Sequence, residues 1–426
     1  MKKIPLYAHI LTGMLIGTIV GVVAVSTNTG WIVEDWLKPF GIIFLKLLKL
    51  VAIPLIFASL VTGISGLSDI TKLSRIGFKT LTFYIFTTIM AVSIGLMLVT
   101  LFEPGQSFPE EKRVELLSKY SQVLETKTDA IESTKSDGSL KFIVDIVPEN
   151  IIASASSNSN MLQVIFFAIL FGVAIVLLKN SKVELVRDFV SGLNEIILKI
   201  IDFIMYFAPI GVMALLAGLI VDYSGDNPAQ SLRLFETLGY YALVVIVGLL
   251  FVGFVFYPIL LRIFAKMPFK IFYKEMFPVH LVAFSTSSSA ATLPVTMEQV
   301  EKGLGVRNEV ASFVLPIGVT VNMDGTSLYQ AVAVVFIAQV FGIEMTFVSL
   351  LTILFTATLA SIGTAAVPGA GVVMLVIVLN AVGIPIEGLA LILAIDRPLD
   401  MMRTVINVTG DAMIAVIIDK NELKNK

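Results

Sequence analysis

The chain has no cysteine, only two histidines and two tryptophans, and 15% charged residues among its 426. Without cysteine it has no disulfide, no thiolate metal site and no thiol nucleophile, and the sequence carries no redox sign of its compartment. The net charge of −2 shows no excess of either sign, so nothing in the composition favours a nucleic-acid partner. His9 and His280 are interpreted as packing or interface residues rather than proton carriers.

Apolar residues, in contrast, are abundant. They make up 57% of the chain, and the mean hydropathy is +0.93, which a soluble domain could not tolerate. Apolar segments of about 20 residues, the length that crosses a bilayer as a helix, recur along the chain. The first half predicts six spans, near residues 7–27, 40–65, 80–102, 161–178, 194–221 and 238–262. A signal peptide cleaved after Ser26 is an alternative for the first, disfavoured by the length of its apolar run.

The connectors between these spans differ in charge. Basic residues gather after the second, fourth and sixth spans, whereas Glu34 and Asp35 follow the first. Because basic residues favour the cytoplasmic side, we expect both termini to be cytoplasmic in a multi-pass protein of the cell (plasma or inner) membrane, in contact with lipid. The polar segment 103–146 is predicted to be an extracellular loop.

Beyond residue 275 the apolar segments are interrupted. Residues 285–289 separate two apolar arms of about ten residues, each about half as long as the bilayer core is thick. Residues 361–371 interrupt the apolar run 348–380 in the same way. Both are predicted to be re-entrant helical hairpins, each followed by a helix with a polar interruption, at 322–326 and within 396–411. Such paired broken segments indicate a transporter site near the midplane, built from an inverted repeat.

Residues 396–411 hold the most informative pattern. At about 100° per residue, their polar side chains fall on one face of a helix. A charge at the bilayer centre costs at least about 2.5–3.5 kcal/mol, so this face is predicted to line a polar site inside the protein. The polar members are Asp396, Asp400, Arg403, Thr404, Asn407 and Asp411.

The chemistry of the polar residues suggests two kinds of ligand. Oxygen donors suited to small hard cations recur near the interruptions. They are Asp324, Asp411, Asn322, Asn407, Thr320, Thr326 and Thr364. Arg403 offers a bidentate fork to a carboxylate, and Asp400, one turn away, can accept from an ammonium. A site holding both suits an amino acid, and an acidic one in particular.

Other functions fit parts of this pattern. An intramembrane aspartyl protease could use Asp324 and Asp411, but both hairpins and Arg403 would then have no role. A passive channel would not need an amino-acid-shaped polar cluster. The closest alternative is a sodium- or proton-coupled symporter of succinate-like C4-dicarboxylates, although such a substrate would leave Asp400 without an ammonium partner.

Four ordered motifs resemble the dicarboxylate/amino acid:cation symporters, the family of archaeal aspartate transporters and eukaryotic excitatory amino acid transporters. The motifs lie at 287–294, 322–326, 361–371 and 400–411, and the match covers essentially the whole chain. The resemblance implies an all-α polytopic membrane protein with eight transmembrane helices, two re-entrant helical hairpins and inverted repeats. It also implies a sodium-coupled symporter of L-aspartate and/or L-glutamate that is not an enzyme and has no organic cofactor.

The resemblance further implies a homotrimer that works as an elevator-type transporter. Residues 1–75 and 147–225 would form a scaffold and trimerisation region. Residues 76–102 and 232–426 would form the moving transport domain.

By motif, the resemblance assigns Arg403 to the substrate side-chain carboxylate and Asp400 to the α-amino group. The other substrate-binding residues would be Ser287, Ser288, Ser289, Thr326, Val367, Pro368, Gly369, Ala370, Gly371, Thr404 and Asn407. Three sodium ions per substrate are implied. The first would use Gly318, Asn322, Asn407 and Asp411; the second Thr320, Ser361, Ile362 and Thr364; the third Tyr84, Thr87, Thr88, Asn322 and Asp324. Met323 lies among these ligands and is a further candidate for sodium contact.

The sequence departs from the family pattern at a few positions. Archaeal members carry an arginine where this chain has Ser287, and eukaryotic members carry one where it has Met401. Arg397, one turn from Met401, either supplies that charge or forms a plain ion pair with Asp396. Gln330 replaces a proton-carrying glutamate, so proton cotransport by that route is not expected. Ala366 replaces a common glycine and is expected to stiffen the second hairpin tip.

Overall fold

The computed structural model describes residues 6–65, 74–108, 147–156, 161–178, 181–224, 229–362, 369–393 and 395–424. These residues form helices and connecting turns, with no strand among them. Five helical segments in this part of the chain are long and apolar enough to cross a membrane: Gly30–Thr62, Ile76–Ser107, Lys182–Asp222, Leu234–Ala265 and Asp396–Glu422. The predicted all-α, multi-span class is therefore confirmed. Residues 109–146, most of the predicted loop, and Ala366 lie outside the described residues.

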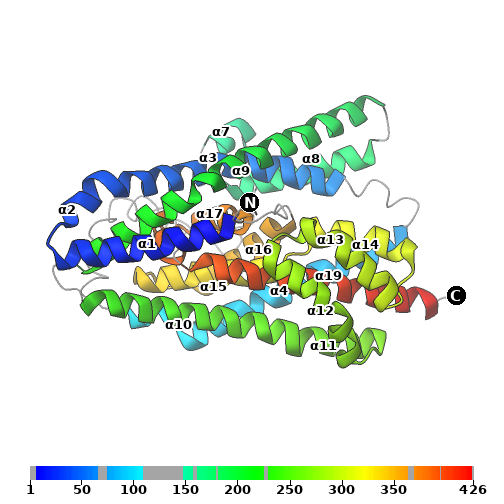
Figure 1. The fold of residues 1–426 in the computed structure, drawn as a ribbon. Coiled ribbons are helices and arrows are strands. Elements are labelled where there is room, and N and C mark those ends of the chain that lie inside the picture. Colours follow the sequence, from blue (N-terminus) through cyan, green and yellow to red (C-terminus); the bar gives the residue numbers. More distant parts are fainter. Residues whose placement is uncertain are drawn as a thin grey trace, which may run out of the picture.

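One group of helices is built from the first half of the chain (Figure 1). It consists of α1 (Leu6–Ser26), α3 (Lys38–Ser65), α8 (Met161–Leu177) and α9 (Ser181–Ser224). Both α1 and α3 pack along α9, and α8 packs on α3. Lys38 pairs with Asp222 at 2.7 Å and joins the start of α3 to the end of α9. In the sequence, the short α2 (Gly30–Ile32) and the π-helical turn Val33–Leu37 lie between α1 and α3, and α7 (Ile151–Ala155) precedes α8.

Helix α9 has 44 residues, more than the predicted span 194–221. Its first turns carry the charged residues Lys182, Glu184 and Arg187, which the hydropathy pattern excludes from the span. Charged residues are good helix formers, so the helix continues through them beyond the apolar segment. The length of the span and the length of the helix are therefore different quantities.

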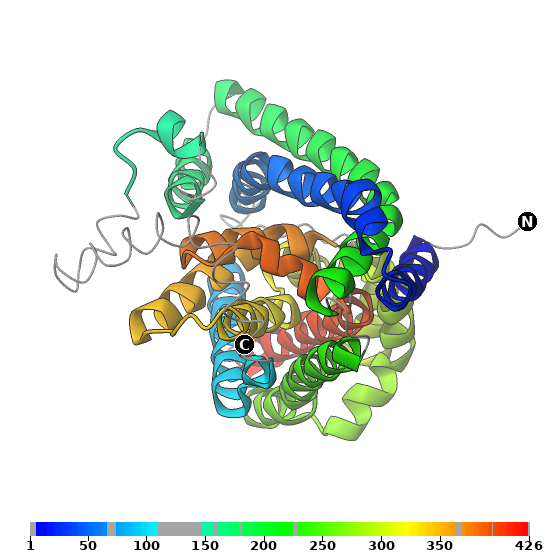
Figure 2. The same cartoon turned by 90° about the vertical axis from the view of Figure 1, so that its left-hand side faces the viewer.

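A second group of helices surrounds α19 (Asp396–Lys424). Figure 2 shows α19, in red, enclosed by its neighbours rather than on the edge. Helices α12, α14 and α15 pack against it, and α15 also packs on α4. The helices of this second group include α4 (Ser74–Phe102), α10 (Ala229–Phe251), α11 (Tyr257–Leu260), α12 (Phe269–Thr286), α14 (Asn308–Val321) and α15 (Asp324–Val340). This enclosed place lets α19 carry charged residues, because they face other helices rather than lipid.

Two helix pairs correspond to the predicted hairpins. Helices α12 (Phe269–Thr286) and α13 (Ser289–Glu298) pack together around a left-handed residue, Ser287, with φ +50°. Helices α16 (Phe347–Ile362) and α17 (Ala370–Ala381) also pack together, and residues 363–368 between them lie outside the described part. The first arm has 18 residues, so the expectation of about ten is wrong. The apolar count missed the helical start, where Lys270, Lys274 and Glu275 lie.

The two predicted polar interruptions have different outcomes. Helix α14 ends at Val321 and α15 begins at Asp324, so the predicted break at Asn322 and Met323 is confirmed. Helix α19, in contrast, runs unbroken through the whole stretch 396–411, so the second predicted interruption is wrong. Its polar side chains find partners on α19 itself and on neighbouring helices, and they leave the backbone hydrogen bonds of the helix intact. The 3-10 turn Ile386–Gly388 and α18 (Leu389–Leu393) precede it.

Short irregular turns complete the second group. A π-helical segment, Val252–Phe256, separates α10 from α11, and another, Leu261–Ala265, follows α11. A third, Gln299–Gly303, extends α13. The 3-10 turn Pro104–Ser107 closes the end of α4 against α15, where the Gly105 amide donates to Gln339 Oε1 at 2.9 Å.

Candidate substrate and cation sites

Arg403 lies at the centre of the polar face of α19 and is fully buried. Its Nη2 donates to Asp396 Oδ1 and Asp400 Oδ1, both at 2.9 Å. The guanidinium lies over the ring of Tyr329 on α15, 3.7 Å from its centre. Its Nε and Nη1 atoms have no hydrogen-bond partner within the described chain. The N–H groups on Nε and Nη1 are therefore left to donate to another acceptor.

Asp400 accepts from three directions. Arg403 reaches Oδ1, while Arg397 Nη1 and the Gly369 amide reach Oδ2 at 3.1 and 3.3 Å. The ion pair that the structure shows for Arg397 is with Asp400 rather than with Asp396, the partner named in one of the two alternatives. Residues three apart lie side by side on a helix, whereas consecutive residues point about 100° apart. Two carboxylates and two guanidiniums thus form one compact, charge-balanced cluster.

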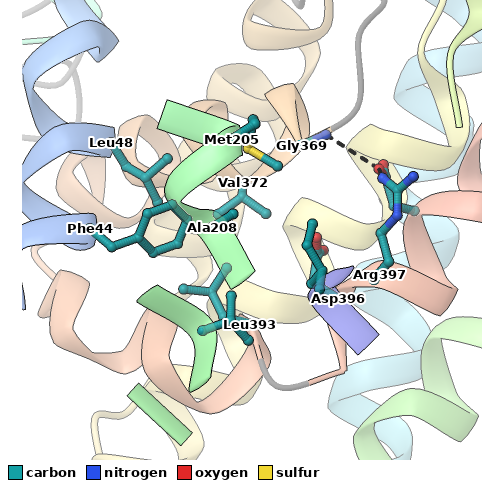
Figure 3. Close-up of a pocket in the computed structure, with 12 residues that line it drawn as sticks. Phe44, Leu48, Met205, Ala208, Gly369, Val372, Leu393, Asp396 and Arg397 are labelled. Carbon is teal, nitrogen blue, oxygen red and sulfur yellow. Dashed lines mark hydrogen bonds and ion pairs between the residues drawn. The ribbon is translucent and has the colours of Figure 1, made fainter. Parts of the chain in front are cut away.

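A cavity lies beside this charged cluster (Figure 3). Asp396, Arg397 and Asp400 line it from α19, together with Gly369 and Val372 from α17. The first helix group supplies the opposite, apolar wall. Its members are Ile10, Phe44, Leu48, Met205, Ala208 and Val212. The charged side chains therefore face the boundary between the two helix groups.

The tip of the first helix pair is buried at all three predicted serines. Ser287 places its hydroxyl in a buried position with no partner among the described residues. Ser288 caps α13 by accepting from the Ala291 amide at 3.1 Å, and Ser289 begins that helix. Because α13 packs against α19, the tip approaches the helix that carries Arg403.

Residues of α15 and α17 converge on Arg403 and Asn407. A Cβ built on Gly371 would lie 3.3 Å from Arg403 Nη1 and 3.0 Å from Thr326 Cγ2. Asn407 donates to Thr326 Oγ1 at 3.2 Å and accepts from the Gly325 amide at 2.8 Å. The structure therefore brings these predicted substrate residues together, while Val367 and Pro368 lie outside the described part.

Two further polar residues, Thr404 and Gln330, lie close to this group. Thr404 donates to the Asp400 carbonyl at 2.9 Å, within α19. Gln330 donates to the Gly371 carbonyl at 3.3 Å, and Ala370 next to it is buried. Gln330 thus ties α15 to the start of α17.

In the first predicted cation set, Gly318 and Asn322 meet Asp411, whereas Asn407 bonds Gly325 and Thr326 on α15. Asn322 Nδ2 donates to Asp411 Oδ1 at 2.8 Å. A Cβ built on Gly318 would lie 2.5 Å from both Asp411 Oδ1 and Tyr84 Oη, so the backbone of α14 meets both side chains there. The Gly318 carbonyl accepts from the Asn322 amide at 2.8 Å and retains a second lone pair.

The third predicted set is assembled around Asp324. Thr88 donates to Asp324 Oδ1 at 2.8 Å, and Thr87 donates to Asn322 Oδ1 at 3.4 Å. Tyr84 donates to the Val314 carbonyl at 2.9 Å, one turn before Gly318. Met323 is buried between α14 and α15.

Asp324 and Asp411 are both almost fully buried, and neither has an ion-pair partner in the described part of the chain. No group of three or more His, Cys, Asp or Glu side chains that could hold a metal occurs there either. The donors around the two carboxylates are amide, hydroxyl and carbonyl oxygens. Such a set suits a hard cation of low charge rather than a tightly held transition metal.

No hydrogen bond joins the members of the second predicted set that the structure describes. Thr320 is exposed and donates to the Ile317 carbonyl at 3.0 Å, within its own helix. Ser361 is buried and donates to the Thr358 carbonyl at 2.8 Å. Ile362 is half-buried at the end of α16, and Thr364 lies outside the described part.

Three residues of the site were missing from the sequence-based assignment. Asp396 bonds Arg403, and its place on the polar face of the helix could have indicated this. Tyr329 lies one turn from Thr326 on α15, a weaker signal. Tyr257 donates to Asp324 Oδ2 at 2.8 Å from a distant helix, and no local pattern points to it.

Comparisons with known proteins agree with this arrangement. The model of the sodium:dicarboxylate symporter family matches residues 6–421. The proton/sodium-glutamate symport protein of Bacillus caldotenax is 36% identical, over 100% of this chain and 98% of the relative. The proton/glutamate-aspartate symporter of Escherichia coli is 34% identical, over 99% and 94%.

Human excitatory amino acid transporter 2 is 35% identical, over 90% of this chain and 73% of the relative. These relatives are transporters, and none is named as a protease or another enzyme. The chain therefore belongs to the sodium:dicarboxylate symporter family and is a transporter rather than an enzyme.

Proposed function

We propose that the chain is a sodium-coupled secondary active symporter of acidic amino acids, L-aspartate and/or L-glutamate. The observation that carries this proposal is the state of Arg403. Its buried guanidinium keeps two nitrogens, Nε and Nη1, without a hydrogen-bond partner in the described chain, next to Asp400. A substrate carboxylate can accept charge-assisted hydrogen bonds from these free donors, and a substrate ammonium is attracted to Asp400. The names of the relatives, which mention glutamate and aspartate, support this substrate class.

The second candidate is a sodium- or proton-coupled symporter of C4-dicarboxylates. The family name favours it, since that name includes dicarboxylates. Asp400 argues against it. This buried carboxylate shares the guanidinium of Arg403 with the substrate, and a substrate without an amine offers Asp400 no cationic group of its own.

Sodium coupling follows from the burial of Asp324 and Asp411. Removing a carboxylate from water without a cation costs several kcal/mol even after relaxation. Sodium ions, as co-transported substrates, offset this cost, and we assign three of them per substrate. Asp411 with Asn322 and Asp324 with Thr88 supply the oxygens that support the first and third sites. The second site needs Thr320 and Ser361 to approach each other.

For the whole protein we propose a homotrimer in the cell membrane with both termini cytoplasmic. The α12–α13 and α16–α17 pairs would be re-entrant hairpins. The first helix group would be the scaffold, and the second would move past it as an elevator. This division is supported by the packing within each group and by the cavity between them. Trp31 and Trp36, exposed near the end of α1 and the start of α3, suit a membrane interface.

The test is uptake of labelled aspartate, glutamate and succinate into proteoliposomes, with an inward sodium gradient or with choline in place of sodium. We expect sodium-dependent uptake of aspartate or glutamate that exceeds uptake of succinate. Uptake of succinate alone would favour the second candidate. Aspartate and glutamate uptake that is unchanged in choline would refute sodium coupling.

The coupling itself is tested with Asp411→Asn. Ion and substrate binding must raise each other's affinity by the same factor. In the wild type, aspartate affinity plotted against sodium concentration on logarithmic axes should therefore have a slope above one. The variant lacks the charge that a sodium ion would neutralise, so its slope should be smaller. A pH gradient alone should not drive uptake, because Gln330 carries no titratable proton.

A further inference from the structure

Tyr257 contacts the Asp324 carboxylate from a helix that carries none of the predicted ligands. It is fully buried in α11, and its hydroxyl donates to Asp324 Oδ2 at 2.8 Å. Thr88 donates to the other oxygen, Oδ1, also at 2.8 Å. The two hydroxyls approach from α11 and α4, so they fix the orientation of the carboxylate from two elements.

The helix around Tyr257 departs from regular α-geometry. The π-helical segment Val252–Phe256 ends directly before it, and Leu261–Ala265 begins four residues after it. A π turn inserts an extra residue and changes the face on which the following side chains lie, and such turns are frequent at functional sites. Tyr257 thus lies in a single α-helical turn, α11, whose direction is set by the distortions on both sides.

Space for the hydroxyl is provided by Gly410 on α19. A Cβ at this position would lie 2.7 Å from Tyr257 Oη and 2.9 Å from Asn322 Nδ2. Any larger residue would therefore displace one or both groups. The absence of a side chain at Gly410 lets the Tyr257 hydroxyl and the Asn322 amide approach α19 at the same point.

We propose that Tyr257 is a positioning residue for the sodium site at Asp324. This inference rests on the sodium coupling proposed above. A carboxylate has about four acceptor positions on its two oxygens, so one hydroxyl on each leaves positions for a cation. The terminal torsion of an aspartate is broad, and the Tyr257 hydroxyl restricts it. With the carboxylate already oriented, sodium binding does not have to order it, which raises sodium affinity without a direct contact between Tyr257 and the ion.

The test is Tyr257→Phe, which removes only the hydroxyl. Aspartate binding is measured on the purified full chain across a range of sodium concentrations. We expect the half-maximal sodium concentration to rise about 3- to 10-fold, the range for loss of an ordinary hydrogen bond, because Tyr257 acts on the ion only through Asp324. Aspartate affinity at saturating sodium should return to the wild-type value, because Tyr257 belongs to an ion site and its hydroxyl bonds Asp324 rather than the charged cluster at Arg403.

Tyr273→Phe is the matched control. Tyr273 donates its hydroxyl to the Gly253 carbonyl, in the π-helical segment just before Tyr257, and does not bond Asp324. The control therefore removes the same group from the same region and should keep the wild-type sodium dependence. Gly410→Ala is a second variant, in which the hydroxyl remains and the added methyl group displaces it, the Asn322 amide or both. It should also raise the half-maximal sodium concentration, and it covers the case in which Tyr257→Phe fails to fold.

Each outcome decides the matter. Wild-type sodium dependence in Tyr257→Phe or Gly410→Ala overturns the inference. Equal shifts in Tyr257→Phe and Tyr273→Phe also overturn it, because the effect would then belong to the helix rather than to the Asp324 contact. A wild-type protein whose aspartate binding ignores sodium refutes the proposed coupling and this inference together. Sodium dependence in the wild type with no effect of Tyr257→Phe refutes the inference alone.

Discussion

At Arg403, a buried guanidinium bonds two carboxylates with one nitrogen and leaves Nε and Nη1 free of partners in the described residues. Such a group is costly to bury unless an acceptor completes it. Its stacking on Tyr329 fixes the plane of the fork, so the direction from which a substrate carboxylate must approach is also fixed.

Arg403→Ala should abolish acidic amino-acid binding. Truncating one partner of a buried charged pair costs about 2–5 kcal/mol, which is a loss of roughly 30-fold or more in affinity. Calorimetric titration with aspartate in saturating sodium measures the loss. Arg403→Lys serves as the control that keeps the charge without the fork, and it should lose most of the affinity as well. Undiminished aspartate affinity in the alanine variant would contradict the assignment.

Arg397 is also predicted to contribute to substrate affinity, through charge. Asp396 and Asp400 balance Arg397 and Arg403, so Arg397→Ala gives the cluster a net negative charge. An anionic substrate is then repelled, and aspartate affinity should fall roughly tenfold for charges a few ångströms apart in a partly screened site. Arg397→Lys keeps the positive charge and should retain most of the aspartate affinity.

The measurement for Arg397 is the same titration, with size-exclusion chromatography to show that the assembly is intact. Wild-type affinity and uptake rate in Arg397→Ala would make the residue a structural ion pair with Asp400 and nothing more.

Among the elements, α17 begins at a glycine in the left-handed region. Gly369 has φ +80°, its amide donates to Asp400, and a Cβ there would lie 2.7 Å from Met205 Cε on α9. One backbone position thus contacts the charged cluster and the opposite helix group together. This arrangement requires glycine for two separate reasons, backbone conformation and space.

Gly369→Ala should weaken aspartate binding and slow uptake. The left-handed conformation costs an alanine about 1–2 kcal/mol, or roughly 5- to 30-fold if the strain is expressed in the bound state. Met205→Ala in the same protein removes the steric part and should restore only some of the loss. Both are measured as aspartate affinity and initial uptake rate. A Gly369→Ala variant that matches the wild type in both would show that this turn is not needed in the tight geometry described.

At the scale of the molecule, the absence of cysteine becomes useful. Cysteine pairs can be introduced without first removing native ones. Met205 and Val372 line the same cavity from the two helix groups, whereas Phe57 and Phe171 lie within the first group with ring centres 5.6 Å apart.

If the groups move past each other, cross-linking Met205→Cys to Val372→Cys with a short thiol-reactive reagent should stop uptake, and a reductant or competing thiol should restore it. Cross-linking Phe57→Cys to Phe171→Cys should leave uptake running, because both residues belong to the same body. Uptake that continues through the completed Met205–Val372 cross-link would rule out the elevator movement.

The sequence by itself determined what depends on local periodicity. The 3.6-residue repeat of α19 was enough to place Asp400, Arg403, Asn407 and Asp411 on one face, because neighbours on a helix face follow from spacing alone. The polar break at Asn322 and Met323 was equally local. Hydropathy gave the multi-span class, since each span must satisfy the bilayer by itself.

Only the tertiary structure decided which groups meet across helices. It paired Arg397 with Asp400, placed Tyr329 under Arg403, and brought Tyr257 to Asp324 from 67 residues away. It also kept α19 unbroken and left Thr320 exposed while Ser361 is buried. Such contacts depend on how the helices pack, and packing involves distant residues whose relative positions no local spacing encodes.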